Sequence, residues 1–478
     1  MVDYSRKWWA LTAVGSGVLL STIDGSIVNI SLNTLVVAFG SNLNIVEWVV
    51  LSYLLTITCL LLLMGRLGDM VGKRRVYVAG FIIFTLASAL CGISPNVGTL
   101  IGFRVVQAVG AAMIQSAGPA LLVTAFPPSE RGTALGATGS FVALGILVGP
   151  ALGGVLLRYV GWESIFYVNV PVGIVGSWLT LRYLASDAKS ARGQVFDVGG
   201  ALLMMASIFG LLLALTDGPT WGWGDGRVLL LFGLFAVAGA GFLAWELHFP
   251  QPMINLRIFR NAAFSLNLLA GFILFIGMAF NLLLTPLFLQ LVYHFELQQA
   301  GLLLMALPLT LSLASPISGR LSDRVGARAL TVSGLAAVAV GLAGLSFTRA
   351  DTPVAQMIAF LLVVGAGIGL FQSPNNSTVF GSAPPEALGV ASGLLAVMRT
   401  LGQTAGIAIA GAVWASRVIA LNGAPIEPIT TASPEILAGG FDTAMRVAAG
   451  LALLAILPSL VGGRATQRRA VSVRPAVK

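Results

Sequence analysis

The sequence predicts an all-α membrane protein with fourteen transmembrane helices, in which two inserted helices separate two six-helix bundles. The first indication is composition, because 57% of the residues are hydrophobic and 9% are charged, against roughly 25% charged residues in a soluble domain. Mean hydropathy is accordingly high, at +0.93. The second indication is a repeat: GRLGDMVGKRR at residues 65–75 recurs as GRLSDRVGARA at residues 319–329. We therefore expect a duplicated membrane protein.

Apolar runs follow one another along the whole chain. About twenty apolar residues cross a bilayer as a helix, and fourteen such runs are present. An even number of spans puts both termini on one side, and most of the 27 Lys and Arg residues fall in the terminal segments and loops of that side. This bias predicts that both termini are cytoplasmic. The runs begin near Trp8, Val46, Val76, Val97, Gly132, Ser164, Val198, Val228, Ala262, Ala300, Ala329, Val354, Gly389 and Gly439.

The repeat also predicts the domain organisation. Residues 1–187 are expected to form an N-terminal six-helix bundle and residues 259–463 a C-terminal one. Residues 188–258 hold two apolar runs that match neither repeat, so they are predicted to be inserted helices with their linkers. Residues 464–478 form a basic cytoplasmic tail. Parallel repeats of this kind place a substrate site between the halves near the bilayer midplane.

Several classes of function lack support in the sequence. The net charge of +9 could indicate nucleic acid, but the basic residues punctuate apolar runs and form no single basic face, so no nucleic-acid partner is expected. Cys59 and Cys91 lie inside apolar runs, which favours packing over a disulfide or a metal site. GDMVGK at residues 68–73 is one residue short of a phosphate-binding loop. We expect no enzyme and no cofactor or metal, and transport that is passive or driven by a gradient.

Three ionisable residues lie within the predicted spans: Asp24, Arg104 and Arg399. Charges at this depth are costly and are candidates for function. Asp24 lies roughly 22 Å from the inner end of its span and Arg104 roughly 10 Å from the outer end, which places them at similar depth in a core about 30 Å thick. Burial disfavours an ionised carboxyl and a nearby Arg favours it, so a change in their separation would make Asp24 exchange protons. The alternative is a static pair that only joins two helices.

Polar side chains within the spans are candidates for lining a substrate cavity, although each single amide is also explained by hydrogen bonding between packed helices. Arg399 is explained equally well by an anionic partner or by helix carbonyls. No Asp or Glu lies in the middle of a span in the second half, so we expect neutral, zwitterionic, monocationic or lipid-like amphiphiles in preference to dications. The candidates are Asn29, Asn33, Gln107, Gln115, Asn281, Gln290, Gln372, Asn375, Arg399 and Gln403.

The two charged turns resemble the loop between helices two and three of the major facilitator superfamily and its counterpart in the second half. Three segments narrow the resemblance to its fourteen-span drug:proton antiporters: TIDGSIVNISL at residues 22–32, RVVQAVGAAM at residues 104–113 and GILVGPALGG at residues 145–154. The resemblance spans nearly the whole chain. It implies the major facilitator fold, neighbouring first and fourth helices, proton coupling through Arg104, and antiport in preference to import.

The resemblance also implies roles for two sets of residues. The charged turns would gate the inner face, with Asp69 capping a neighbouring helix or pairing with Arg74 or Arg131, and Glu130 as an acidic relay; alternatively they only set topology. The glycines of the fifth helix lie at small-xxx-small spacing, which lets helices approach closely, so we expect them to hold the two halves together and limit leak, with Pro150 as a kink. The gating set is Gly65, Arg66, Asp69, Gly72, Arg74, Glu130, Arg131, Gly319, Arg320, Asp323, Gly326 and Arg328, and the helix-five set is Gly145, Gly149, Pro150, Gly153 and Gly154.

These observations predict a proton-coupled antiporter that exports hydrophobic or amphipathic drugs from the cytoplasm by alternating access. The alternative is a lipid or glycolipid exporter or flippase on the same scaffold. A receptor that transports nothing is a third possibility, but the sequence offers no soluble sensory domain for it. We expect a bacterial plasma-membrane protein that is a monomer, with small amphipathic substrates and membrane lipids as partners and protons as the coupling ion.

Overall fold

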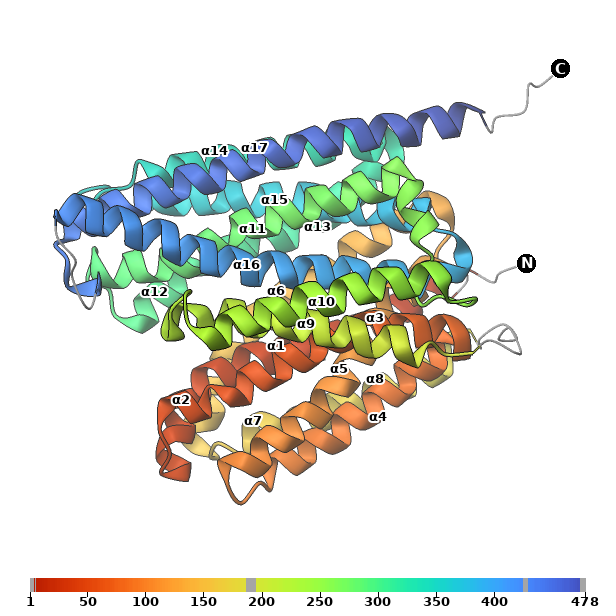
Figure 1. Cartoon of the computed structure of the whole chain (residues 1–478), viewed down its shortest axis with the longest axis horizontal. Helices are drawn as coiled ribbons and strands as arrows, with labels where there is room; N and C mark the ends of the chain where they lie inside the picture. The colour runs from red at the N-terminus through yellow and green to blue at the C-terminus, as the bar shows by residue number, and fades with distance from the viewer. Residues whose placement is uncertain (1–3, 5, 186–194, 424–428, 473–478) are drawn as a thin grey trace. The chain divides into compact units, whose positions relative to one another are not determined.

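The computed structural model describes residues 4, 6–185, 195–423 and 429–472, and every regular element within these ranges is helical. Fourteen helices are long and apolar enough to cross a membrane, as the sequence predicts (Figure 1). Three short α-helices were not predicted, and a single residue separates each from the longer helix that follows it. The elements of the first half are α1 (Lys7–Phe39), α2 (Leu43–Val46), α3 (Trp48–Val71), α4 (Lys73–Gly92), α5 (Val97–Ala125), η1 (Pro128–Glu130), α6 (Arg131–Tyr159), α7 (Ser164–Tyr167) and α8 (Asn169–Tyr183).

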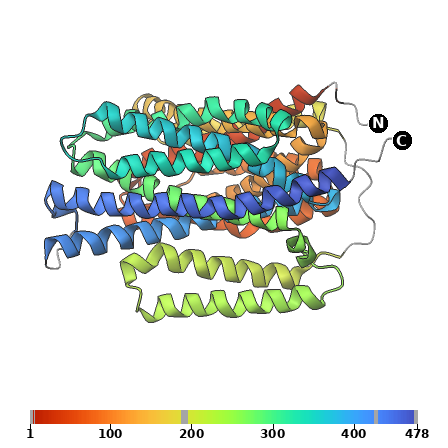
Figure 2. The same ribbon diagram turned by 90° about the horizontal axis from the view of Figure 1, so that it is seen from above.

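The inserted segment forms a helical hairpin, α9 (Val198–Trp221) and α10 (Gly226–His248) (Figure 2). The two helices run antiparallel, because the Ser207 hydroxyl donates to the carbonyl of Phe235 while Gly199 packs against Trp245. The remaining elements are η2 (Leu256–Arg260), α11 (Ala262–Leu291), α12 (Leu297–Leu304), α13 (Ala306–Val325), α14 (Ala327–Ser346), α15 (Val354–Ser382), η3 (Pro385–Ala387), α16 (Leu388–Asn422), η4 (Ile429–Thr431) and α17 (Pro434–Ser472). Part of the predicted basic tail thus continues α17, and residues 473–478 lie outside the described residues.

The chain divides into two compact units. Unit 1 contains residues 1–214, 224–258 and 383–397, and unit 2 contains residues 215–223, 259–382 and 398–478. The first residues of α16, which the sequence assigned to the C-terminal bundle, therefore belong with unit 1. The inserted hairpin belongs to unit 1 except for the end of α9 and the turn that follows it.

The same helix pairs are in contact in the two halves. α4 packs on α5 in unit 1, and their repeat counterparts α14 and α15 pack in unit 2. Glycines make both contacts close: a Cβ on Gly110 would lie 2.7 Å from the carbonyl oxygen of Gly80, and a Cβ on Gly367 would lie 2.7 Å from that of Gly334. Small residues let helix backbones approach in this way within membranes. The sequence repeat is thus a repeat of packing as well.

Both charged turns depend on a glycine with positive φ. Gly72 has φ 120° between α3 and α4, and Gly326 has φ 88° between α13 and α14. Residues with a Cβ rarely adopt such a conformation, so glycine lets one helix end and the next begin without a loop. These two glycines were predicted as turn residues from the repeat.

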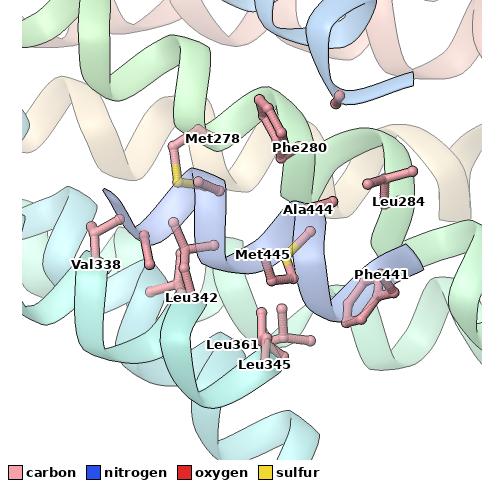
Figure 3. Close-up of a cluster of buried hydrophobic side chains, with 14 of the residues drawn as sticks. Met278, Phe280, Leu284, Val338, Leu342, Leu345, Leu361, Phe441, Ala444 and Met445 are labelled. Atoms are coloured by element: carbon pink, nitrogen blue, oxygen red, sulfur yellow. The ribbon is translucent and has the colours of Figure 1, made fainter. Parts of the chain in front are cut away.

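The core of unit 2 is an apolar cluster formed by α11, α14, α15 and α17. Phe280, Leu342 and Met445 are fully or almost fully buried in it (Figure 3). In a bilayer the hydrophobic effect does not drive helices together, so such interfaces are stabilised by close packing of side chains.

Candidate functional site

A buried ion pair joins α1 and α5 within unit 1. Arg104 Nη1 donates to Asp24 Oδ2 at 2.7 Å, and the exposed fractions of the two side chains are 1% and 0%. The contact expected from their matching depths is thus present and direct. Its role in proton coupling remains a prediction.

Two amides complete the surroundings of the Asp24 carboxylate. Oδ1 accepts from Gln107 Nε2 at 3.0 Å and from Asn169 Nδ2 at 2.9 Å. Gln107 also donates to Ser88 Oγ at 2.7 Å and accepts from Arg104 Nη1 at 2.6 Å. Helices α1, α4, α5 and α8 therefore meet in one polar network, which we call the Asp24 network: Asp24, Ser88, Arg104, Gln107 and Asn169.

The remaining contacts of Arg104 are with α3 and α7. Its Nε donates to the carbonyl oxygen of Val49 at 3.1 Å. Its guanidinium lies over the ring of Tyr53, 3.9 Å from the centroid, and 5.9 Å from the ring centroid of Phe166. Aromatic faces stabilise cations electrostatically, most strongly where water is excluded. Arg104 is thus held by contacts that do not all depend on Asp24.

Three donors converge on the Asp24 carboxylate, and they come from two other helices, α5 and α8. A movement of α5 or α8 relative to α1 would remove donors from it. Helix movements of about 1–2 Å are common in conformational transitions and suffice to break such hydrogen bonds.

Sequence reasoning missed three members of these surroundings: Ser88, Asn169 and Tyr53. Asn169 follows the short helix α7 and opens α8, so its position near Asp24 depends on a break that the sequence did not reveal. The available signal was an amide within an apolar run, the same signal that selected Asn29 and Asn33. Gln107, predicted to line the substrate cavity, is instead fully buried in the Asp24 network.

The other predicted cavity residues take varied positions. In unit 1, Asn29 and Asn33 are exposed on α1, and Gln115 is half-buried on α5. In unit 2, Asn281 is buried and accepts from the Thr285 hydroxyl at 2.7 Å, and Gln290 donates to the carbonyl of Pro286 at 3.3 Å.

Asn375 on α15 is 2% exposed, and its Oδ1 has no hydrogen-bonding partner among the described residues. Half-buried positions are taken by Gln372, Arg399 and Gln403. Gly402 and Gly406, on the same helix as Arg399 and Gln403, pack α16 closely on α11. A Cβ on Gly402 would lie 2.9 Å from the carbonyl oxygen of Phe272, and a Cβ on Gly406 would lie 2.4 Å from that of Ile276. The substrate role of all these residues remains a prediction.

The first charged turn holds the start of α16 within unit 1. Asp69 is 1% exposed, and its Oδ1 and Oδ2 accept from the backbone N–H groups of Gly389 and Val390 at 2.9 and 3.0 Å. Asp69 therefore caps a neighbouring helix, the first of the two predicted alternatives. Its ion-pair partner is Lys73, at 2.8 Å, and not Arg74 or Arg131.

Glycine makes this cap possible. A Cβ on Gly65 would lie 2.3 Å from the carbonyl oxygen of Gly389, and a Cβ on Gly389 would lie 2.2 Å from that of Gly65. Real Cβ atoms do not approach backbone so closely, so any side chain at either position would force α3 and α16 apart. The start of α16 is thus held by a charge and by contact between two backbones.

The other residues of the gating set lie as follows. Arg74 donates to the carbonyl of Leu181 at the end of α8. Glu130 pairs with Lys7 at the start of α1, and its role as a relay to Asp69 stays a prediction. Arg66 and Arg131 are half-buried. In the second turn, Gly319 is buried, Arg320 is exposed, and Asp323 and Arg328 are half-buried.

The helix-five glycines pack α6 on α1. A Cβ on Gly145, Gly149 or Gly153 would lie 2.6, 1.8 or 2.6 Å from a side chain of α1, whereas one on Gly154 would meet nothing within 4 Å. The Ser26 hydroxyl adds a hydrogen bond to the carbonyl of Gly145 at 3.2 Å. These contacts join two helices of the same half, not the two halves as predicted. The reason is that the glycines face the helix that carries Asp24. Pro150 lies between them inside α6.

Comparison with known proteins supports the same fold and class. Residues 14–407 match the model of the Major Facilitator Superfamily. The riboflavin transporter RibZ of Clostridioides difficile is 36% identical over 405 residues, covering 84% of this chain and 87% of that protein. The multidrug resistance protein Stp of Mycobacterium tuberculosis is 33% identical over 407 residues, covering 85% and 75%.

Among solved structures, the human organic anion transporter MFSD10 superposes with a TM-score of 0.65 at 14% identity and covers 95% of this chain and 99% of that chain. Agreement at this identity concerns the fold, and it confirms the predicted fold class. The matched region contains both charged turns, the Asp24 network and the helix-five glycines. The chain is a many-span membrane protein that belongs to the Major Facilitator Superfamily.

Proposed function

We propose that this protein is a proton-coupled antiporter that exports hydrophobic or amphipathic drugs from the cytoplasm by alternating access. The observation that carries the proposal is the Asp24 network, a carboxylate with 0% exposure that accepts from one guanidinium and two amides. Ionisable groups are retained at such depth where they serve transport. The resistance protein with 33% identity supports drugs as the cargo.

In this mechanism Asp24 is ionised while its three donors are in place. Opening of the protein toward the outside separates α1 from α5, and Asp24 takes up a proton from that side. Return of the helices restores Arg104 beside Asp24 and expels the proton toward the cytoplasm. The Asp24 carboxyl group carries one proton in each transport cycle. Arg104 keeps its charge throughout, because the intrinsic pKa of a guanidinium is too high for it to titrate.

The cap on α16 serves as the gate. α16 begins in unit 1 and continues as part of unit 2, so Asp69 holds the first turn of a helix whose larger part belongs to the other unit. Loss of this cap would release the start of α16 from α3. The turn therefore acts in gating, in addition to its effect on topology.

A second candidate cargo follows from the relative named as a riboflavin transporter, which is 36% identical. Riboflavin is a flat amphipathic heterocycle, so it falls in the same chemical class as many drugs. A lipid or glycolipid exporter on the same scaffold is the third candidate. We further propose that the protein lies in a bacterial plasma membrane with both termini in the cytoplasm, and that it works as a monomer without catalytic chemistry or a cofactor.

The proposal is tested with the purified full chain in liposomes under an imposed pH gradient. Internal pH is followed on adding a monocationic dye, a neutral antibiotic, riboflavin or a fluorescent lipid analogue. We compare wild type with Asp24→Asn, and Asp225→Asn is the control because Asp225 lies outside the spans and pairs with the exposed Arg227.

Proton flux that starts on adding drug, disappears in Asp24→Asn and persists in Asp225→Asn is the expected result. Flux with riboflavin alone would assign the vitamin as cargo. Movement of the lipid analogue without any flux on adding drug or riboflavin would replace the proposal with lipid transport.

A further inference from the structure

Two buried carboxyl groups face the same space at one end of the inserted hairpin. Asp197 precedes α9, and Glu246 lies in the last turn of α10. Their exposed fractions are 3% and 4%. Asp197 Oδ2 and Glu246 Oε1 are both buried and have no hydrogen-bonding partner among the described residues.

These two oxygens converge on one point. A Cβ built on Gly200 would lie 2.5 Å from Asp197 Oδ2 and 3.0 Å from Glu246 Oε1. Glycine leaves that point free, so the two carboxyl groups face the same small space. Two carboxylates that share a site cannot both be ionised at low cost.

The other oxygen of each group has a structural partner. Asp197 Oδ1 accepts from the backbone N–H of Gly200 and from Trp245 Nε1, both at 2.8 Å, and so caps α9. Glu246 Oε2 accepts from the backbone N–H of Ile254 at 3.1 Å. Each carboxyl group is thus held in place through one oxygen while its second oxygen faces the shared space.

The helix dipoles assign the proton. Asp197 lies at the N-terminus of α9, where the dipole favours a negative charge, whereas Glu246 lies at the C-terminal end of α10, where it disfavours one. The charged groups that act on Glu246 are Asp197, which repels its negative charge, and Arg66 of the first charged turn, which attracts it. His248, two residues further along, is exposed and bonds to the carbonyl of Ala244.

We infer that Asp197 and Glu246 form a second proton-binding site, which holds one proton between the two carboxyl groups. Binding of this proton does not depend on drug transport, so the site can exist even if the proposed cargo is wrong.

The site is tested by infrared spectroscopy of the full chain in lipid nanodiscs, titrated over pH. A protonated carboxyl group has a C=O stretching band that disappears when it ionises. We expect wild type to lose such a band as pH rises, Glu246→Gln to lack it, and Asp225→Asn on the outer turn of the same hairpin to retain it. Arg66→Gln should raise the pH at which the band disappears, because it removes the attracting charge.

Asp197→Asn gives an independent test if Glu246→Gln does not fold. The amide oxygen can still cap α9, while the amide N–H group replaces the repelling oxygen and donates to Glu246. The band should then disappear at a pH lower by about 1–3 units. An unchanged band in both variants would overturn the proposal. So would a band that responds to sodium at constant pH, because the site would then bind a cation.

Discussion

Replacing Asp24 by Asn tests whether the buried pair serves transport or only joins helices. Asn has one oxygen where the carboxylate has two, and its NH2 group must face either Arg104 or the amides of Gln107 and Asn169, all of which are donors. Removing one partner of a buried ion pair costs about 3–5 kcal/mol, because the remaining charge is left uncompensated. We expect the free energy of unfolding to fall by that amount.

A double variant separates the two roles. Arg104→Gln in the Asp24→Asn background removes the uncompensated charge, so it should recover much of the lost free energy of unfolding. It cannot restore a group that exchanges protons, so proton flux driven by substrate should stay absent. Both quantities are measured on the same preparation, unfolding in lipid bicelles by steric trapping and flux in liposomes.

Two results would refute this reasoning. Recovery of both stability and proton flux in the double variant would make the pair purely structural. A change in the free energy of unfolding within about 0.5 kcal/mol for Asp24→Asn, the range typical of surface positions, would contradict the buried geometry. Asp225→Asn is the control and should change neither measurement, because its ion pair with Arg227 is exposed.

Three further predictions concern packing and the gate. Asp69→Ala should cost about 0.5–2 kcal/mol, because it removes a helix cap. It should also speed hydrogen exchange of the first amides of α16, and unchanged exchange would contradict a role of this cap in holding α16. Gly149→Leu should lower the midpoint of thermal unfolding, since its Cβ would lie 1.8 Å from a hydroxyl, whereas Gly154→Leu should be tolerated; equal effects would contradict the packing. Cys59 and Cys91 are buried and should react with maleimide only after unfolding, so rapid labelling of either would show that it is accessible.

The number and order of the spans could be predicted from sequence because the bilayer imposes a simple rule. A helix must be apolar over most of its length to cross the membrane, and the loops carry most of the charges. Hydropathy therefore locates the spans, and the placement of Lys and Arg predicts their orientation. The charged turns could be predicted because two copies of one motif mark equivalent positions in the two halves. The short helices α2, α7 and α12 were not predicted, because a single residue separates each of them from the longer helix that follows, and hydropathy does not locate such a break.

The chemistry of the site could be predicted only in part. Asp24 and Arg104 stand out because charges are rare within spans, and their matching depths are set by helix rise alone. Ser88, Tyr53 and Asn169 could not be identified, because the sequence contains many polar residues of the same types within apolar runs. Which of them reach Asp24 depends on how α3, α4 and α8 are rotated about their axes.

The sequence by itself determined the class of the protein, its fourteen spans, its internal repeat and the central ion pair, because each follows from local hydropathy, spacing or motif. Tertiary structure decided which groups share a site. It brought the first residues of α16 to Asp69, which caps that helix. It also directed the helix-five glycines toward α1 within one half, and placed Asp197 near Glu246. These contacts join residues far apart in the chain, and they form only where the packing of helices brings their backbones together.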